Sequence, residues 1–182
     1  MRVWSESSNL LSDFQFDFRK SKSTVDCIFV LSPIIDKVIN HKRKKVYRAF
    51  VDFQKAFDLV YRNRIWLNIL NMGGSCKILD MLQAKYSSVK SCVRTNTSTI
   101  VNTAYFDSFV RVKQREPLSH FLSICFINDM YTFIKYGSFD VVNIDILQLL
   151  LLLFADDTVL FSYSKEGLQF QLNQLNTYCS NW

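Results

Sequence analysis

Two adjacent carboxylates near the end of the chain are the residues best able to carry chemistry. Asp156 and Asp157 stand between an apolar run, Ile146 to Phe154, and a second run that begins at Thr158. This pattern predicts a tight hairpin with an acidic turn and buried arms. Neighbouring side chains of a straight strand point to opposite faces. Two consecutive acids can therefore serve one site only where the backbone bends, as it does at a hairpin tip.

Like charges crowded at such a tip favour a bound cation, because they otherwise repel one another. Hard carboxylate oxygens with no histidine nearby indicate Mg²⁺ rather than Zn²⁺. The alternative is that both aspartates only shape the turn, which is a common role for this residue.

A third carboxylate, Asp52, favours the metal site. It ends a strand predicted over Val46 to Phe53, expected to be buried, and one small sheet can bring both strand ends together. Three carboxylates there would hold two Mg²⁺ ions, with Mn²⁺ as a possible substitute, for phosphoryl transfer.

The composition of the chain indicates the class of protein that contains this site. The 182 residues are 49% hydrophobic, which is typical of one globular domain with a core. The net charge of +6 suits a polyanionic partner, although many proteins that bind no nucleic acid carry as much. Five cysteines without a Cys-x-x-Cys pair predict reduced thiols and an intracellular protein, nuclear or cytoplasmic. No signal peptide, membrane span, catalytic triad or glycine-rich phosphate loop is predicted.

Along the chain, some segments have the hydrophobic period of a helix and others that of a strand. Together they predict an α+β fold: a largely antiparallel sheet with helices packed on one face. The first expected elements are a helix capped by Ser23 or Thr24 and kinked at Pro33, followed by the strand 46–53. Helices over 62–71 and 77–86 come next, separated by Gly73 and Gly74, and then short antiparallel strands within 88–112. A helix over 117–134, the acidic hairpin and a last helix complete the chain, the last helix having Leu168, Leu172, Leu175 and Cys179 on one face.

Several segments together resemble the reverse transcriptases of non-LTR (LINE-type) retrotransposons. Ala49 to Asp58, followed later by Phe154 to Asp157, resembles the first and third palm motifs of that family. Three further stretches match in the same order: Gln15 to Thr24 resembles a fingers segment, Gln114 to Ser119 with Ile127 to Asp129 resembles the second palm motif, and Leu168 to Trp182 resembles the stretch leading into the next motif.

The resemblance implies a polymerase palm with part of the fingers and without the thumb. Residues 1–182 would form one partial reverse transcriptase domain, with a fingers remnant at about 10–45 and the palm at about 46–182. The implied activity is RNA-directed DNA synthesis, which needs an RNA template, a DNA primer and deoxynucleoside triphosphates. No protein partner and no membrane are implied.

The resemblance also assigns roles to individual residues. Asp52, Asp156 and Asp157 would bind two Mg²⁺ ions, with the carbonyl of Phe53 near one of them. The expected nucleotide or template contacts are Phe57, as the bulky residue that excludes a 2′-hydroxyl, Gln114, Arg19 and Lys20.

The sequence departs from the family pattern around the second palm motif. Glycine is expected at the positions of Asp17, Ser21, Arg111 and Arg115, and a small or thiol-bearing residue at Glu116. A long arginine and an added acid beside Gln114 are expected to obstruct nucleotide and template. The chain is thus expected to be a truncated, degenerate copy that is weak or inactive. The alternative is a non-catalytic remnant that binds nucleic acid, for instance through the basic cluster at 41–48, which could equally be a solvated loop.

Overall fold

The structure is a computed structural model that describes most of the chain. The described residues are 10–17, 19, 21–41, 44–54, 60–87, 90–92, 94–96, 100–102, 105–107, 112, 116–144 and 147–181. None of the helices within these ranges is long and apolar enough to cross a membrane.

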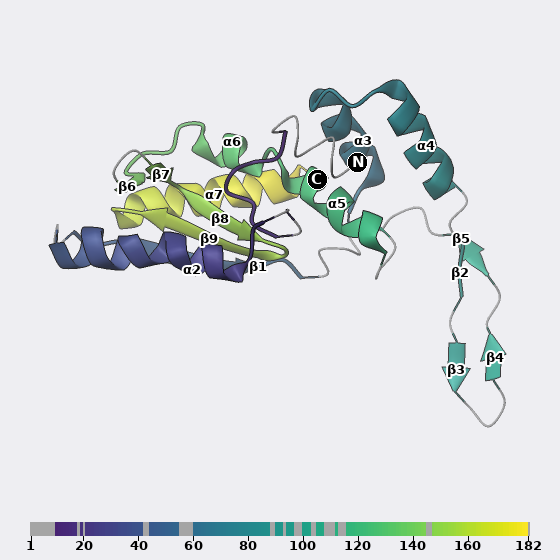
Figure 1. Cartoon of the computed structure of the whole chain (residues 1–182), viewed down its shortest axis with the longest axis horizontal. Helices are drawn as coiled ribbons and strands as arrows, with labels where there is room; N and C mark the ends of the chain where they lie inside the picture. Colours follow the sequence, from purple (N-terminus) through teal and green to yellow (C-terminus); the bar gives the residue numbers. More distant parts are fainter. Residues whose placement is uncertain are drawn as a thin grey trace.

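A small antiparallel sheet lies at the centre of the larger body (Figure 1). Its strands are β1 (Tyr47–Asp52), β9 (Asp157–Ser162) and β8 (Leu151–Phe154), in the order β1-β9-β8. Leucine, valine and phenylalanine dominate β8 and β9, which are mostly buried. The prediction that β1 is buried was wrong, because its residues alternate between half-buried and exposed, with Phe50 70% exposed. Gln15 adds a parallel bridge to Leu153, so the N-terminal segment extends the sheet beyond β8.

Helices α6 (Met130–Lys135) and α7 (Lys165–Ser180) cover one face of this sheet. Leu151, Leu153 and Leu160 of the strands are buried in one cluster with residues of both helices. The α+β palm architecture predicted from the sequence is therefore confirmed.

The opposite face is also partly covered, which the sequence did not predict. Helix α2 (Thr24–Pro33) continues into a π-helix, η1 (Ile34–His41), and both pack in a second cluster with Leu152 and Phe161. Because neighbouring strand residues point to opposite faces, Leu151 and Leu152 place the two clusters on the two sides of the sheet. At Pro33, where the sequence predicted a kink, the α-helix changes to a π-helix.

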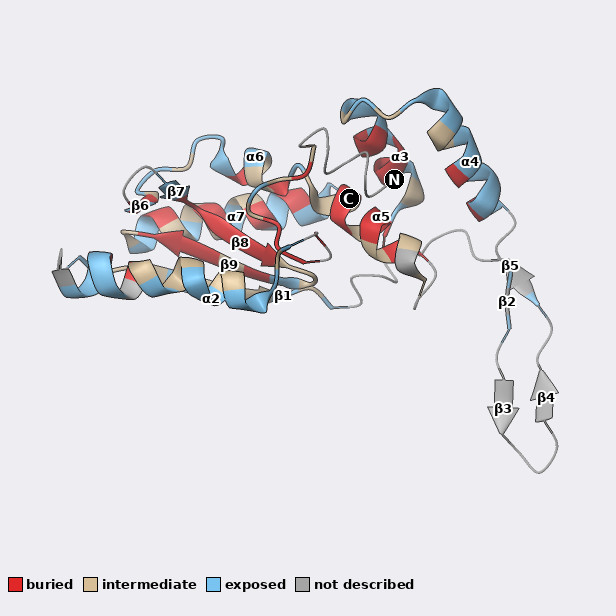
Figure 2. Ribbon diagram, viewed as in Figure 1, coloured by how far each residue is buried: buried red, intermediate tan, exposed pale blue. Residues whose placement is uncertain are grey.

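A second body of helices lies beside the sheet and contains α3 (Arg62–Asn71), α4 (Cys76–Ser87) and α5 (Pro117–Ile127). Their shared core includes Trp66, Tyr86 and Leu122. Gly73 ends α3 with a φ of 81°, as the sequence predicted. Figure 2 shows that the buried positions lie on β8, β9 and the inward sides of the helices, whereas the outer side of α2 is exposed.

Two hairpins complete the fold. Strands β6 (Val142–Ile144) and β7 (Leu147–Leu149) precede β8. Between α4 and α5 the chain leaves the body as a long arm, in which β2 (Lys90–Ser91) pairs with β5 (Phe106–Asp107) and β3 (Arg94–Asn96) pairs with β4 (Ile100–Asn102) (Figure 1). The short antiparallel strands predicted within 88–112 are thereby confirmed where the structure describes that stretch.

Two helix predictions were wrong in part. The single helix expected over 117–134 is broken at Asn128 and Asp129, and the side chains of both residues make tertiary hydrogen bonds. In α7 the buried side chains include Gln171, Leu175 and Tyr178, while Cys179 is exposed. The face of α7 that packs on the sheet therefore includes Tyr178 in place of Cys179, and the Tyr178 hydroxyl donates a hydrogen bond to the Asp129 carboxylate.

Candidate active site

The fold brings the predicted carboxylates of two distant segments together. Asp52 is the last residue of β1 and pairs directly with Asp157, the first residue of β9. The backbone N–H of Phe53 donates to the carbonyl oxygen of Asp156 at 3.1 Å. Directly paired residues project from the same face of an antiparallel sheet, so the Asp52 and Asp157 side chains lie on one face beside the hairpin turn.

The turn between β8 and β9 differs in one respect from the prediction. Its two central residues are Ala155 and Asp156, because Phe154 pairs with Asp157 across the hairpin. Ala155 has a φ of 53°, in the left-handed region that side chains other than glycine rarely adopt. Asp157 therefore belongs to the strand, whereas Asp156 stands in the turn next to the left-handed Ala155. Non-glycine residues in this conformation often mark functional sites.

Ala155→Gly is expected to stabilise the chain, because glycine adopts this φ without strain. We expect a gain of about 0.5–1 kcal/mol in the free energy of unfolding, after the greater entropy of glycine in the unfolded chain is subtracted. Ala155→Val should instead lose about 1 kcal/mol or more, since β-branching worsens the strain. Urea unfolding measures both. Ala84, exposed within α4, is the matched control, and Ala84→Gly should lose about 0.5–1 kcal/mol. Equal losses in both glycine variants would contradict strain at Ala155.

The electrostatics of the hairpin end suit a hard cation. Asp52 and Asp157 are exposed, Asp156 is half-buried, and two like charges stand directly opposite each other, which is unfavourable without a counter-charge. Their carboxylate oxygens are the donor type that Mg²⁺ prefers. Within the described ranges, however, no three acidic, histidine or cysteine side chains are gathered closely enough to hold a metal. The backbone therefore places the strand end of Asp52 beside the turn that carries Asp156 and Asp157, while their side chains do not form such a cluster.

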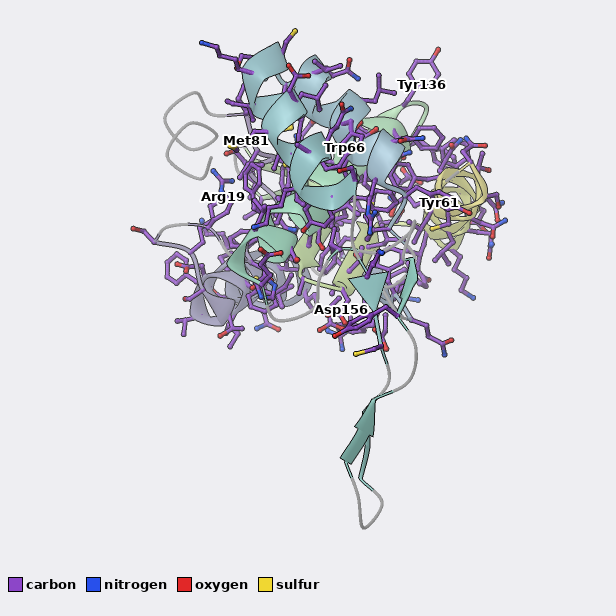
Figure 3. All side chains as sticks on the ribbon, turned by 90° about the vertical axis from the view of Figure 1, so that its right-hand side faces the viewer. Arg19, Tyr61, Trp66, Met81, Tyr136 and Asp156 are labelled. Atoms are coloured by element: carbon purple, nitrogen blue, oxygen red, sulfur yellow. The ribbon has the colours of Figure 1, made fainter. Side chains whose placement is uncertain are left out.

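The other predicted site residues divide into two groups. Lys20, Phe57 and Gln114 lie outside the described residues, as does Arg115. Arg19 is described, and it is buried, with Nη1 donating to the carbonyl oxygen of Ser12 at 2.8 Å. Figure 3 places Arg19 and Asp156 apart on the body. Phe53 is half-buried and packs with the sheet cluster that contains α6 and α7.

Glu116 has a different setting from the one expected. Its carboxylate forms a salt bridge with Lys85 and accepts a hydrogen bond from the Tyr86 hydroxyl at 3.5 Å. The hydrogen bond to Glu116 is the main reason that the pKa of Lys85 is raised. The added acid therefore has a counter-charge, so it is not an isolated negative charge before α5. Sequence reasoning missed this pairing because Lys85 and Glu116 are separated by the whole arm.

A polar network around the buried Arg64 side chain, at the junction of α5 and α6, was also missed. The guanidinium of Arg64 donates from Nη2 to both carboxylate oxygens of Asp129, at 2.9 and 3.2 Å, and its side chain is 1% exposed. The Tyr178 hydroxyl donates to the same carboxylate at 2.7 Å. Burial, with the Asp129 charge second, raises the pKa of Tyr178. An Asn-Asp pair inside an apolar helical pattern was the available sequence signal.

Asn128 extends this network to the N-terminal segment. Its side-chain Oδ1 accepts from the Ser12 backbone N–H at 2.8 Å, and Nδ2 donates to the Leu10 carbonyl at 3.0 Å. The same segment pairs with β8, where Phe16 N–H donates to the Leu153 carbonyl at 3.0 Å. The junction therefore connects α3, α7 and the N-terminal segment, which in turn borders the strand leading to Asp156.

Comparisons with known proteins agree with this architecture. The chain is similar to a solved structure of apo telomerase from Candida tropicalis, truncated from its C-terminal domain, with a TM-score of 0.64 and 13% sequence identity. The likeness covers 96% of this chain and 36% of that chain, so the present chain spans about a third of its length and shares its fold. No curated protein matches the chain significantly. The sequence profile described as "Reverse transcriptase (RNA-dependent DNA polymerase)" matches residues 2–182. The chain therefore belongs to the reverse transcriptase family.

Proposed function

We propose that this reverse transcriptase domain fragment contains the metal-binding acids of an RNA-directed DNA polymerase, with Asp52, Asp156 and Asp157 as the catalytic residues. The observation that carries the proposal is the direct pairing of Asp52 with Asp157 beside the strained turn that holds Asp156. The substrates would be deoxynucleoside triphosphates, with a DNA primer on an RNA template. The motif segments around Asp52 and Asp156 support a non-LTR (LINE-type) origin.

Two Mg²⁺ ions bound by these carboxylates would lower the pKa of the attacking hydroxyl and stabilise the leaving oxygen of phosphoryl transfer. The chain itself contributes the placement of the donors. Asp52 and Asp157 supply oxygens from one face of the sheet, and the turn presents Asp156 beside them. The hydrogen bond from Phe53 N–H to the Asp156 carbonyl holds the end of β1 against the turn. Phe53 would offer its own carbonyl oxygen as a further donor.

The remaining residue roles are proposed from the resemblance of the motif segments. Phe57 would exclude a 2′-hydroxyl, and Gln114, Lys20 and Arg19 would contact nucleotide or template. For Arg19 this requires leaving its hydrogen bond to Ser12. Residues of about 10–45 would form the fingers remnant and about 46–182 the palm. Packing of α2 and η1 on the sheet means that the two parts share one core.

Primer extension tests the proposal. Purified chain is incubated with a labelled DNA primer on an RNA template, nucleoside triphosphates and Mg²⁺ or Mn²⁺. Extension that needs the metal and depends on the RNA template supports polymerase activity. Template-independent addition, or extension that persists in EDTA, would contradict it.

A second function, nucleic acid binding without catalysis, is favoured by one observation. The described acidic side chains do not gather into a three-ligand cluster. Salt-dependent binding of RNA with no metal-dependent extension would favour this function over polymerisation.

A further inference from the structure

The sheet face that carries Asp52 is covered on β8 and β9 but open on β1. Phe50 shares this face with Leu152, because both pair with Val159, and Leu152 is buried in the cluster with α2 and η1. Alternate residues of a strand project from one face, so Arg48, Phe50 and Asp52 form a row along β1, and all three are exposed. This open row ends at an acid of the proposed metal site.

Phe50 is the unusual member of the row. Among the residues of β1, β8 and β9, all of which the structure describes, it is the one large hydrophobic side chain that is exposed, at 70%. The Arg48 guanidinium lies 5.6 Å from the centre of the Phe50 ring, within the range of a cation–π contact. An aromatic ring beside a guanidinium suits a nucleic acid strand, because bases stack on the ring and arginine contacts phosphate.

Spacing along β1 favours a polynucleotide over a single nucleotide. A β-strand rises about 3.3 Å per residue, so Phe50 lies about 7 Å and Arg48 about 13 Å from Asp52. A nucleic acid strand rises about 3.4 Å per nucleotide, so these distances correspond to about two and four nucleotide steps. A nucleotide whose triphosphate is bound at the metal site would hold its phosphates beside Asp52, too far away to contact Arg48.

Charge along β1 changes sign in the matching direction. The exposed Lys44 and Lys45 precede the strand and Arg48 lies in its first half, whereas Asp52 ends it and pairs with Asp157. Metal ions at the acidic end would bind the reacting end of a polynucleotide, and the basic end would contact phosphates further along the same strand. In the proposed reaction, that reacting end is the 3′-hydroxyl of the primer.

We propose that Phe50 and Arg48 form the binding surface for the 3′ end of the DNA primer. The Phe50 ring stacks against the last nucleotides, and Arg48 contacts a phosphate behind them. The inference rests on the proposed function, because that function supplies the primer. It adds to the acids a surface that holds the terminal hydroxyl beside Asp52.

Binding in EDTA tests this surface without chemistry. A fluorescently labelled DNA primer annealed to an RNA template is titrated with the chain at several KCl concentrations. Phe50→Ala is expected to weaken binding at least about fivefold, with no change in the slope of log K against log salt, because a stacked ring carries no charge. Arg48→Gln should reduce the magnitude of that slope by about 1.

Further variants separate stacking from other effects. Phe50→Trp keeps an aromatic face and should bind within about twofold of wild type, whereas Phe50→Leu should bind as weakly as Phe50→Ala. Tyr136→Ala removes an 87% exposed ring next to the end of α6 and should bind as wild type does. Lys77→Gln, at an exposed position of α4, is the matched control for Arg48→Gln and should leave the slope unchanged.

Crosslinking locates the contact along the primer. 5-Iodouracil is placed at the second or at the eighth nucleotide from the 3′ end, in separate primers, and the complexes are irradiated in MgCl₂ without nucleoside triphosphates. The second position should crosslink to Phe50, and this crosslink should be lost in Phe50→Ala. A crosslink to Phe50 from the eighth position instead would show that the residue contacts another part of the duplex.

Other outcomes would also overturn the proposal. Wild-type affinity of Phe50→Ala or Phe50→Leu would exclude stacking, and an equal loss in Tyr136→Ala would make the effect non-specific. A wild-type dimer in sedimentation analysis that dissociates in Phe50→Ala would show that a second copy covers the ring. Binding that depends on Phe50, without any primer extension by wild type, would count against the catalytic proposal alone. Extension that requires the acids, with unchanged binding in Phe50→Ala, would count against the primer surface alone.

Discussion

Relative to the weak primer extension expected of the wild-type chain, Asp156→Asn is expected to lower the metal-dependent rate by at least about 10³-fold. A bound metal supplies several kcal/mol of transition-state stabilisation, and each 1.36 kcal/mol corresponds to a tenfold change in rate. Asparagine retains the size of aspartate but removes the negative charge that a hard cation requires. Asp52→Asn and Asp157→Asn should show the same loss, since their paired positions serve the same metal site. Extension is measured as nucleotides added per unit time under initial-rate conditions.

A surface acid provides the control for the change in net charge. Asp80 lies exposed on α4, and Asp80→Asn should extend primers at the wild-type rate. Activity of Asp156→Asn within a few fold of wild type would contradict the assignment of that residue. The same result for all three acids would contradict the two-metal site.

The same variants carry a second expectation that does not depend on activity. Without metal, Asp52→Asn or Asp157→Asn should raise the free energy of unfolding by up to about 1 kcal/mol, because like charges directly opposite in a sheet are destabilising. With Mg²⁺ at about ten times its dissociation constant, wild type should gain about 1.4 kcal/mol and the variants less. Thermal unfolding with and without MgCl₂ measures both effects. A variant that is less stable than wild type in EDTA would indicate a structural role for the carboxylate.

The sequence predicted the strand ends that carry Asp52, Asp156 and Asp157 well, because the signals for these strands are local and strong. A strand ending in Asp52 and a hairpin carrying Asp156 were both visible from residue types alone, and antiparallel pairing then places their ends together. The details of the turn were not visible. Nothing in the sequence indicates that Ala155 takes the left-handed conformation and that Asp157 pairs within the strand. Local propensity would have assigned these roles to the aspartates.

Long-range pairing explains the other differences. Lys85 and Glu116 meet only because the arm returns to its base, and Arg64 meets Asp129 only because α3 packs against α5. Hydrophobic periodicity shows which face of one helix is apolar, but it does not show which polar side chain of another element pairs with a buried charge. For the same reason the break between α5 and α6 was read as continuous helix.

Loss of the Asp129 carboxylate is expected to be the most destabilising change in this network. Arg64 has a 1% exposed side chain, and its guanidinium lies over the rings of Phe126 and Tyr178, at 5.2 and 4.6 Å. In Asp129→Ala the buried guanidinium keeps its charge and loses its counter-ion. Breaking a buried ion pair in this way costs about 3–5 kcal/mol. We expect about 3 kcal/mol, at the lower end, because the Asp129 side chain is 48% exposed and water can reach the vacated position.

The reverse substitution should be milder. Arg64→Met replaces the buried charge with an apolar side chain of similar length, and the Asp129 carboxylate left behind can be hydrated at the surface. We expect a loss of about 1–2 kcal/mol, from the hydrogen bonds to Asp129 and to the Phe126 carbonyl. Combining both substitutions should cost less than their sum, because no buried charge is then left unpaired.

Urea unfolding of wild type, both single variants and the double variant gives the coupling energy directly. Tyr178→Phe serves as the matched control: it removes only the hydroxyl that donates to Asp129 and should lose about 1–2 kcal/mol. A loss in Arg64→Met as large as in Asp129→Ala would mean that the contacts of the guanidinium with the rings and backbone, rather than its buried charge, stabilise the junction. Additive losses in the double variant would mean that the two side chains are not energetically coupled. The expected difference between Asp129→Ala and Arg64→Met follows from burial: Arg64 is inaccessible to water, so its unpaired charge costs more than the unpaired charge of the half-exposed Asp129.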